Sequence, residues 1–119
     1  MFERFPNLRI ASIENGAQYL PELIAKVRST ANKMPGYWKD DPVETFRRHV
    51  WVNPFWEDDV YQVSDCMGPD RVLFGSDWPH IEALPEPADY VRELKEFDEV
   101  EMRRILLDNV RELLTLRPT

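Results

Sequence analysis

Three short apolar runs in the sequence are each followed by a segment with helical periodicity. The runs fall at residues 8–13, 49–53 and 72–74, and each is the length of a buried strand rather than of a helix. Strands that alternate with helices are typical of right-handed βαβ units, whose strands lie parallel in one sheet. The sequence therefore predicts an α/β fold in which helices flank a parallel sheet.

Five segments are expected to be helical from the spacing of their apolar residues. They cover residues 19–33, 42–49, 58–66, 88–97 and 99–116. The last helix has the clearest start, because Asp98 is followed three residues later by Glu101, as in a capping box. Its apolar stripe is predicted to consist of Met102, Ile105, Leu106, Val110, Leu113 and Leu114.

Composition narrows the class of protein. The chain of 119 residues is 43% hydrophobic and 12% aromatic, as in globular proteins, and it carries a formal net charge of −7. An acidic chain without a basic cluster is a poor ligand for nucleic-acid phosphates. The single cysteine excludes an internal disulfide, and no apolar run approaches the roughly 20 residues that span a bilayer. We therefore expect a cytoplasmic protein that binds neither nucleic acid nor membrane.

The most informative stretch is residues 71–80, which read RVLFGSDWPH. The apolar run ends at Gly75, and Asp77 follows at the exit of the predicted strand. Enzymes with parallel sheets keep their working groups at the carboxyl ends of the strands, so Asp77 is a candidate for chemistry. The alternative is that the Asp77 side chain only caps the turn that follows.

Together with three other segments, this stretch resembles the amidohydrolase-related family of metal-dependent hydrolases and decarboxylases. The other segments are FPNLRI at residues 5–10, ENG at 14–16 and DNVRELL at 108–114. The resemblance implies that residues 1–119 form a single C-terminal fragment of a distorted (β/α)8 TIM barrel, with strands six to eight and their helices. It also implies a small-molecule substrate and a divalent metal, zinc first of all, that activates water for attack on a carbonyl-type group or supports nonoxidative decarboxylation.

The resemblance assigns one residue directly. Asp77 matches the family's aspartate at the end of strand eight, which implies that it is a metal ligand and a catalytic group that orients water or accepts its proton. Glu14 stands where many relatives carry a histidine, so it is either a substrate-binding or ligand-supporting acid or a solvated loop carboxylate. His80 either borders the pocket or is structural, and Trp78 is either pocket wall or packing.

The principal metal ligands that the resemblance implies, an H-x-H pair and a further histidine, are not in this sequence, whose two histidines are His49 and His80. Catalytic zinc usually needs about three protein ligands, so we expect the isolated chain to hold no metal tightly and to be inactive. The alternative is a non-catalytic, self-associating interaction module. Either way, three strands leave open sheet edges, from which we predict a homo-oligomer.

Overall fold

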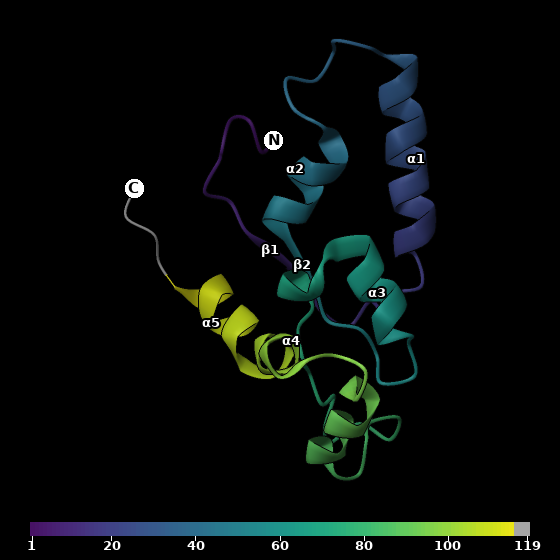
Figure 1. Ribbon diagram of the computed structural model, residues 1–119, viewed down its shortest axis with the longest axis vertical. Coiled ribbons are helices and arrows are strands. Elements are labelled where there is room, and N and C mark those ends of the chain that lie inside the picture. The colour runs from purple at the N-terminus through teal and green to yellow at the C-terminus, as the bar shows by residue number, and fades with distance from the viewer. Residues whose placement is uncertain (116–119) are drawn as a thin grey trace.

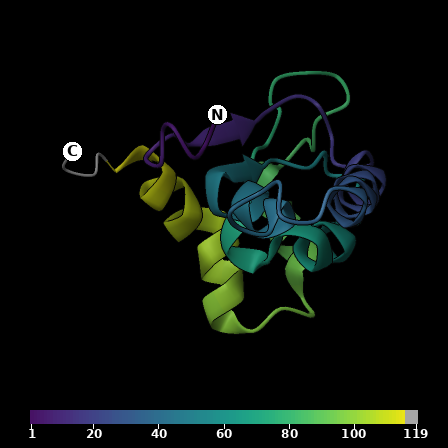
Figure 2. The same cartoon turned by 90° about the horizontal axis from the view of Figure 1, so that it is seen from above.

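The computed structural model describes residues 1–115 and is an α/β structure with a small parallel sheet (Figure 1). Strand β1 (Ile10–Ser12) pairs in parallel with β2 (Val50–Val52), with Ile10 opposite Val50. The predicted sheet and its parallel sense are confirmed, although both strands are shorter than the apolar runs that predicted them. Figure 2 shows the helices gathered to one side of β1 and β2.

The expected third strand is reduced to one parallel bridge, between Val52 and Val72. Leu73 N–H donates to Val52 C=O at 2.8 Å, and the ladder goes no further. The next donor in a parallel ladder would be the backbone N–H of residue 54, and that residue is a proline, which has none. The predicted strand over residues 72–74 was therefore too long, because a proline just beyond the neighbouring strand β2 cannot continue the ladder.

Three of the predicted helices are confirmed, with small shifts at their ends. They are α1 (Leu20–Lys33), α2 (Pro42–His49) and α3 (Val60–Met67). Asp59 caps α3 by accepting from Tyr61 N–H and Gln62 N–H, which explains why this helix starts later than residue 58.

The helix expected over residues 88–97 is instead a 3₁₀ helix, η2 (Pro87–Leu94), which follows the short 3₁₀ turn η1 (Pro69–Arg71). The Tyr61 hydroxyl donates to Glu93 C=O, near the end of η2, at 2.8 Å and accepts from Glu96 N–H, beyond that end, at 3.0 Å. A side chain of α3 thus satisfies the backbone groups that a further helical turn would have used.

The C-terminal helix starts at the predicted capping box but is not uniform. It comprises α4 (Glu99–Arg103), a π-helical turn η3 (Arg104–Asp108) and α5 (Asn109–Leu114), and its predicted end at Leu116 lies outside the described residues. In the π turn, Asn109 N–H donates to Arg104 C=O, five residues back, and Ile105 C=O accepts from Phe74 N–H at 3.1 Å.

This π turn corrects the predicted apolar stripe. The extra residue in the turn rotates the following helix, so that Asn109 is fully buried while Val110 and Leu114 are 36% and 72% exposed. Ile105, which precedes the shift, is buried as predicted. A stripe drawn at a constant period of 3.6 residues could not anticipate a change of period.

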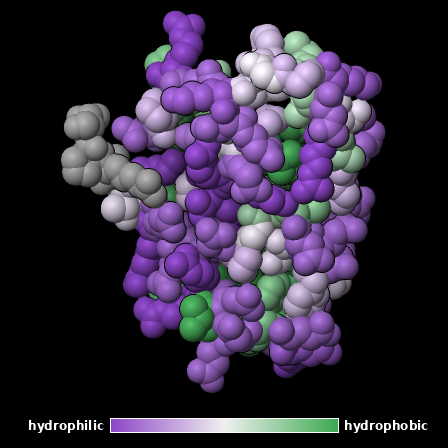
Figure 3. Space-filling view, turned by 45° about the horizontal axis from the view of Figure 1, so that its top comes forward, coloured by the Kyte–Doolittle hydropathy of each residue, from purple (hydrophilic) through white to green (hydrophobic). Residues whose placement is uncertain are grey.

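The core lies between the sheet and the helices. It is built from apolar side chains of β2, α1, α3, η2 and the C-terminal helix, among them Val50, Val52, Leu20, Val60, Val63, Met67, Leu94 and Ile105. Trp51 points away from this cluster, and the Arg71 guanidinium lies 4.4 Å from its ring centroid. Most of the face seen in Figure 3 is hydrophilic. No helix among residues 1–115 is long and apolar enough to cross a membrane.

Candidate metal centre

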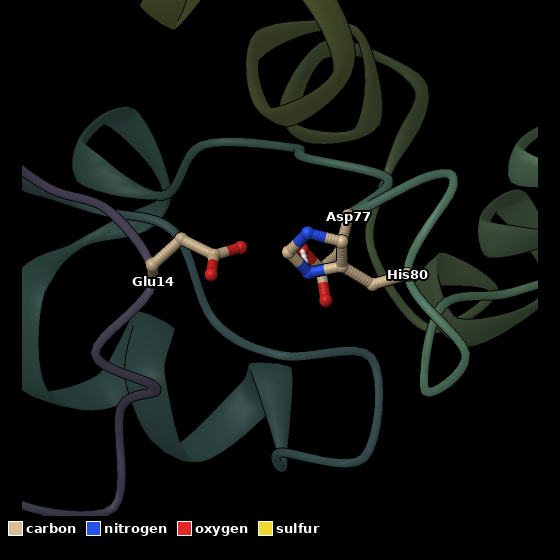
Figure 4. Close-up of side chains that lie close together, drawn as sticks. All are labelled: Glu14, Asp77 and His80. Atoms are coloured by element: carbon tan, nitrogen blue, oxygen red, sulfur yellow. Dashed lines mark ion pairs between the residues drawn. The ribbon is translucent and has the colours of Figure 1, made fainter.

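Three side chains selected in the sequence meet beyond the carboxyl ends of the strands: Glu14, Asp77 and His80 (Figure 4). Glu14 comes two residues after β1, and the other two follow the segment that bridges to β2. One ligand atom from each residue lies within 4.8 Å of the other two. Because parallel strands end at the same edge of a sheet, residues 63 positions apart in the chain become neighbours.

The backbone turns sharply at both strand exits. Glu14 has φ of +61° and Asp77 has φ of +56°, so both occupy the left-handed region that non-glycine residues seldom adopt. Such conformations cost of the order of 1 kcal/mol each and concentrate at functional sites. The turn after Asp77 is closed by its carbonyl oxygen, which accepts from His80 N–H at 2.9 Å. This turn brings the imidazole back over the Asp77 side chain.

The three groups are electrostatically linked. Asp77 Oδ1 lies 3.0 Å from His80 Nδ1. The Asp77 carboxylate raises the pKa of Glu14, first through a side-chain hydrogen bond and then through its negative charge, and partial desolvation adds to the effect. Glu14 therefore holds its proton more readily beside Asp77 than it would alone. A cation placed among them would remove the same repulsion.

The three residues border a cavity of about 350 Å³. Its other lining residues come from the loops after β2 and after residue 74: Asn53, Pro54, Phe55, Trp56, Glu57, Gly75, Ser76, Glu82 and Leu84. The Trp56 indole N–H donates to Glu82 C=O at 2.7 Å, which joins the two loops across the cavity. No lysine or arginine is among the described lining residues.

Three of the four residues selected from the sequence lie at this cavity, and the fourth does not. Asp77, Glu14 and His80 are brought together, whereas Trp78 is 66% exposed and does not line the cavity. Trp56, and not Trp78, contributes the tryptophan of the cavity wall. Trp56 and Asn53 were not selected in the sequence, although both follow the second predicted strand, at the same sheet edge as Asp77.

The donor set fits a divalent transition metal. Two carboxylate oxygens and one imidazole nitrogen are ligand types that zinc and its neighbours accept in catalytic sites. His80 is the only histidine in the set, since the other histidine of the chain, His49, has its Nδ1 at 2.7 Å from Leu8 C=O, outside this cluster. The cluster could therefore supply at most three protein ligands.

The fold and the site define an α/β protein whose candidate ligands lie at the carboxyl ends of parallel strands. The family model for amidohydrolases matches residues 1–116, and the chain belongs to the amidohydrolase family. This confirms the resemblance seen in the sequence.

Two similar proteins are longer than this chain. It is 25% identical over 125 residues to a 2-amino-3-carboxymuconate-6-semialdehyde decarboxylase of Dictyostelium discoideum, covering 99% of this chain and 34% of that protein. It is 44% identical to the crystal structure of an amidohydrolase from Mycobacterium avium subsp. paratuberculosis K-10, with a TM-score of 0.90 over 96% of this chain and 30% of that one. The chain thus spans about a third of the length of these relatives.

Proposed function

We propose that this chain forms the last three βα units, strands six to eight, of a distorted (β/α)8 barrel and supplies one wall of its metal centre. The convergence of Glu14, Asp77 and His80 at one sheet edge carries the proposal. The parallel order of β1, β2 and the segment bridged at Val72 supports it, because consecutive barrel strands are parallel neighbours. In such a barrel, the reacting groups stand at the carboxyl ends of the strands.

Asp77 is the residue to which we assign the central role. Its carboxylate would ligate the metal and orient the attacking water or accept its proton, with His80 and Glu14 as weaker ligands or as hydrogen-bond partners of the substrate. When bound, a divalent metal, zinc first of all, would supply the Lewis acidity that lowers the pKa of water toward neutrality. Trp56 and Phe55 would exclude bulk water from that side of the cavity.

The reaction class that we propose for the whole barrel is hydrolysis of a carbonyl-type small molecule or a related nonoxidative decarboxylation. The name of the Dictyostelium relative supports the second chemistry, and the name of the mycobacterial relative supports the first. For the chain alone we propose no turnover. Its sequence contains two histidines, and only His80 lies in the cluster, so the chain lacks the imidazole-rich ligand set of a tight catalytic zinc site.

Zinc titration by calorimetry tests the assignment of Asp77. We expect the wild-type chain to take up zinc reversibly and to lose it on dialysis, and Asp77→Asn to bind at least tenfold more weakly, a loss of at least about 1.4 kcal/mol. Asp65→Asn is the matched control, because it removes one carboxylate from the exposed surface of α3. Identical titrations for wild type and Asp77→Asn would remove Asp77 from the site.

The proposed inactivity needs a separate measurement. Stoichiometric zinc or manganese retained after dialysis, together with ester hydrolysis or carbon dioxide release that Asp77→Asn abolishes, would overturn it. The proposal of a metal centre would survive that result, since only the claim that more ligands are needed would fail.

We also propose that the chain self-associates. Within residues 1–115, β1 pairs only with β2, so its second edge presents backbone groups that another strand can use. Light scattering across a range of concentrations tests this, and we expect the average mass to exceed that of one chain. A monodisperse monomer at every concentration would contradict it.

A further inference from the structure

Asn53 occupies the point at which the parallel ladder stops. Leu73 N–H donates to Val52 C=O, and the regular partner of Leu73 C=O would be the backbone N–H of Pro54, which does not exist. The Asn53 side chain fills that place, because its Nδ2 donates to Leu73 C=O at 3.3 Å and also to Pro54 C=O at 3.1 Å. A side-chain amide thus completes the sheet where the backbone cannot.

Gly75 leaves room for this side chain. A Cβ atom at Gly75 would lie 2.7 Å from Asn53 Oδ1 and 2.9 Å from Nδ2, closer than real Cβ atoms approach other groups. Gly75 has no positive φ, so the space taken by Asn53, and not backbone freedom, is what requires a glycine there. The glycine that ends the apolar run is therefore paired with an asparagine that directly follows the neighbouring strand β2.

Asn53 contacts the end of β1 on one side and the segment that leads to Asp77 on the other. Its backbone N–H donates to Ser12 C=O at 3.0 Å, two residues before Glu14. Its side chain holds Leu73 and abuts Gly75, which stands two residues before Asp77. Asn53 also lines the cavity that the three candidate ligands border.

We propose that Asn53 is the positioning residue of this site: its backbone N–H holds the exit of β1, its side-chain amide holds the exit of the Asp77 segment, and together they set the separation of Asp77 from Glu14. The inference rests on the proposed function in so far as that separation serves metal binding. Asparagine suits the position because its amide is a donor on a short stem. Aspartate would set an oxygen against the Leu73 carbonyl, and alanine would leave that carbonyl without its donor.

Asn53→Ala and Gly75→Ala test the proposal from the two sides of the contact. In the metal-free crystal structure of Asn53→Ala, we expect the ligand atoms of residues 14, 77 and 80 no longer to lie within 4.8 Å of one another. We further expect both variants to bind Co²⁺ roughly 10–100-fold more weakly, as is usual when a group that orients ligands is lost, with an altered visible absorption spectrum.

Asn109→Ala is the matched control. Asn109 also donates from its amide to two backbone carbonyls of the same segment, Pro69 and Val72 at 2.8 Å each, but at the opposite end from Asp77. Under conditions in which each variant is folded by circular dichroism, we expect this control to keep the wild-type Co²⁺ affinity and spectrum, even though it is less stable.

The outcomes separate the two claims. Unchanged ligand positions in the Asn53→Ala structure, or wild-type Co²⁺ binding by both alanine variants, would overturn the role of Asn53. Equal losses in Asn109→Ala would overturn it too, because the effect would then be one of general stability. If the wild type itself bound no Co²⁺, the proposed metal centre would fail, while the crystallographic comparison would still decide whether Asn53 sets the separation.

Discussion

Replacing Asn109 is the perturbation whose cost can best be worked out from the structure. The residue is fully buried, and its Nδ2 donates to Pro69 C=O and Val72 C=O at 2.8 Å each. Asn109→Ala removes two hydrogen bonds worth about 1 kcal/mol each and leaves two carbonyls short of a donor, while the small cavity adds to the loss. The Asn109 Oδ1 atom has no hydrogen-bond partner in the wild type, so its removal offsets part of the loss in stability.

The expected net loss for Asn109→Ala is about 3 kcal/mol in the free energy of unfolding. Asn109→Asp should cost at least as much, because it turns a double donor into a carboxyl group that faces two carbonyl oxygens. Urea unfolding monitored by tryptophan fluorescence measures both, with an unchanged m-value as the sign that the unfolded state is not altered. Asn15→Ala is the control, since Asn15 makes its hydrogen bonds within an exposed loop.

We expect the Asn15→Ala control to change stability by less than about 0.5 kcal/mol. A loss below about 1 kcal/mol for Asn109→Ala would refute the reasoning. Such a small loss would mean that water or a shifted helix replaces the lost donors. The π turn would then not be needed to bring Asn109 into contact with the carbonyls of Pro69 and Val72.

Three further predictions follow from single groups. Tyr90→Phe should leave stability unchanged or raise it by up to about 1 kcal/mol in thermal unfolding, because the buried Tyr90 hydroxyl has no partner and burial raises its pKa; a clear loss would show that the hydroxyl is bonded. In the metal-free protein, Asp77→Asn should lower the pKa of Glu14 toward its ordinary value in a carboxyl NMR titration. Because the pKa of Glu14 is raised on folding, its contribution to stability is present at pH values below its unfolded pKa and is lost as the pH rises through its folded pKa. The decrease in stability over this pH range should therefore be smaller in Asp77→Asn. Burial raises the pKa of the Cys66 thiol, so Cys66 should react with a disulfide reagent at pH 8 more slowly than it does in urea; equal rates would contradict that burial.

The regular elements were predictable because burial imposes a period on the sequence. The apolar spacing of residues 19–33 gave α1 almost to the residue, and the dense apolar run before Pro54 gave β2. The capping box at Asp98 was also readable, since both of its hydrogen bonds are local. These features depend on neighbours within a few positions in the chain.

The errors arose where a distant segment supplied or withheld a hydrogen bond. The third strand stopped short because Pro54, 19 residues before Leu73, has no N–H to give it. The π turn at Arg104–Asp108 frees Ile105 C=O to accept from Phe74 N–H, and the Tyr61 hydroxyl bonds to one backbone group near the end of η2 and one beyond it. The spacing of apolar residues within a helix does not reveal that Phe74 or Tyr61 will be its hydrogen-bond partner.

The candidate site was predicted residue by residue and not as a group. Asp77 stood out because it followed an apolar run, Glu14 because it stood at a strand exit where many relatives carry a histidine, and His80 because it follows Asp77 by three residues. The distance between these side chains could not be predicted from the sequence, because it depends on the left-handed backbone conformations of Glu14 and Asp77 at the strand exits. Asn53 was missed because an asparagine before a proline is a common strand end, and its role appears only beside Gly75.

Glu14 is the residue whose interpretation the geometry changes most. In the sequence, a glutamate in place of the expected histidine cast doubt on any direct part in metal binding. Its carboxyl group nevertheless lies close enough to that of Asp77 for Asp77 to raise its pKa, and the His80 ring lies over Asp77, near both carboxyl groups (Figure 4). Two carboxylates in contact repel each other unless a proton or a cation lies between them, and here both are held by a strained backbone. This geometry favours our proposal that Glu14 acts as a metal ligand, so that the substitution would change the ligand type at this position rather than remove a ligand.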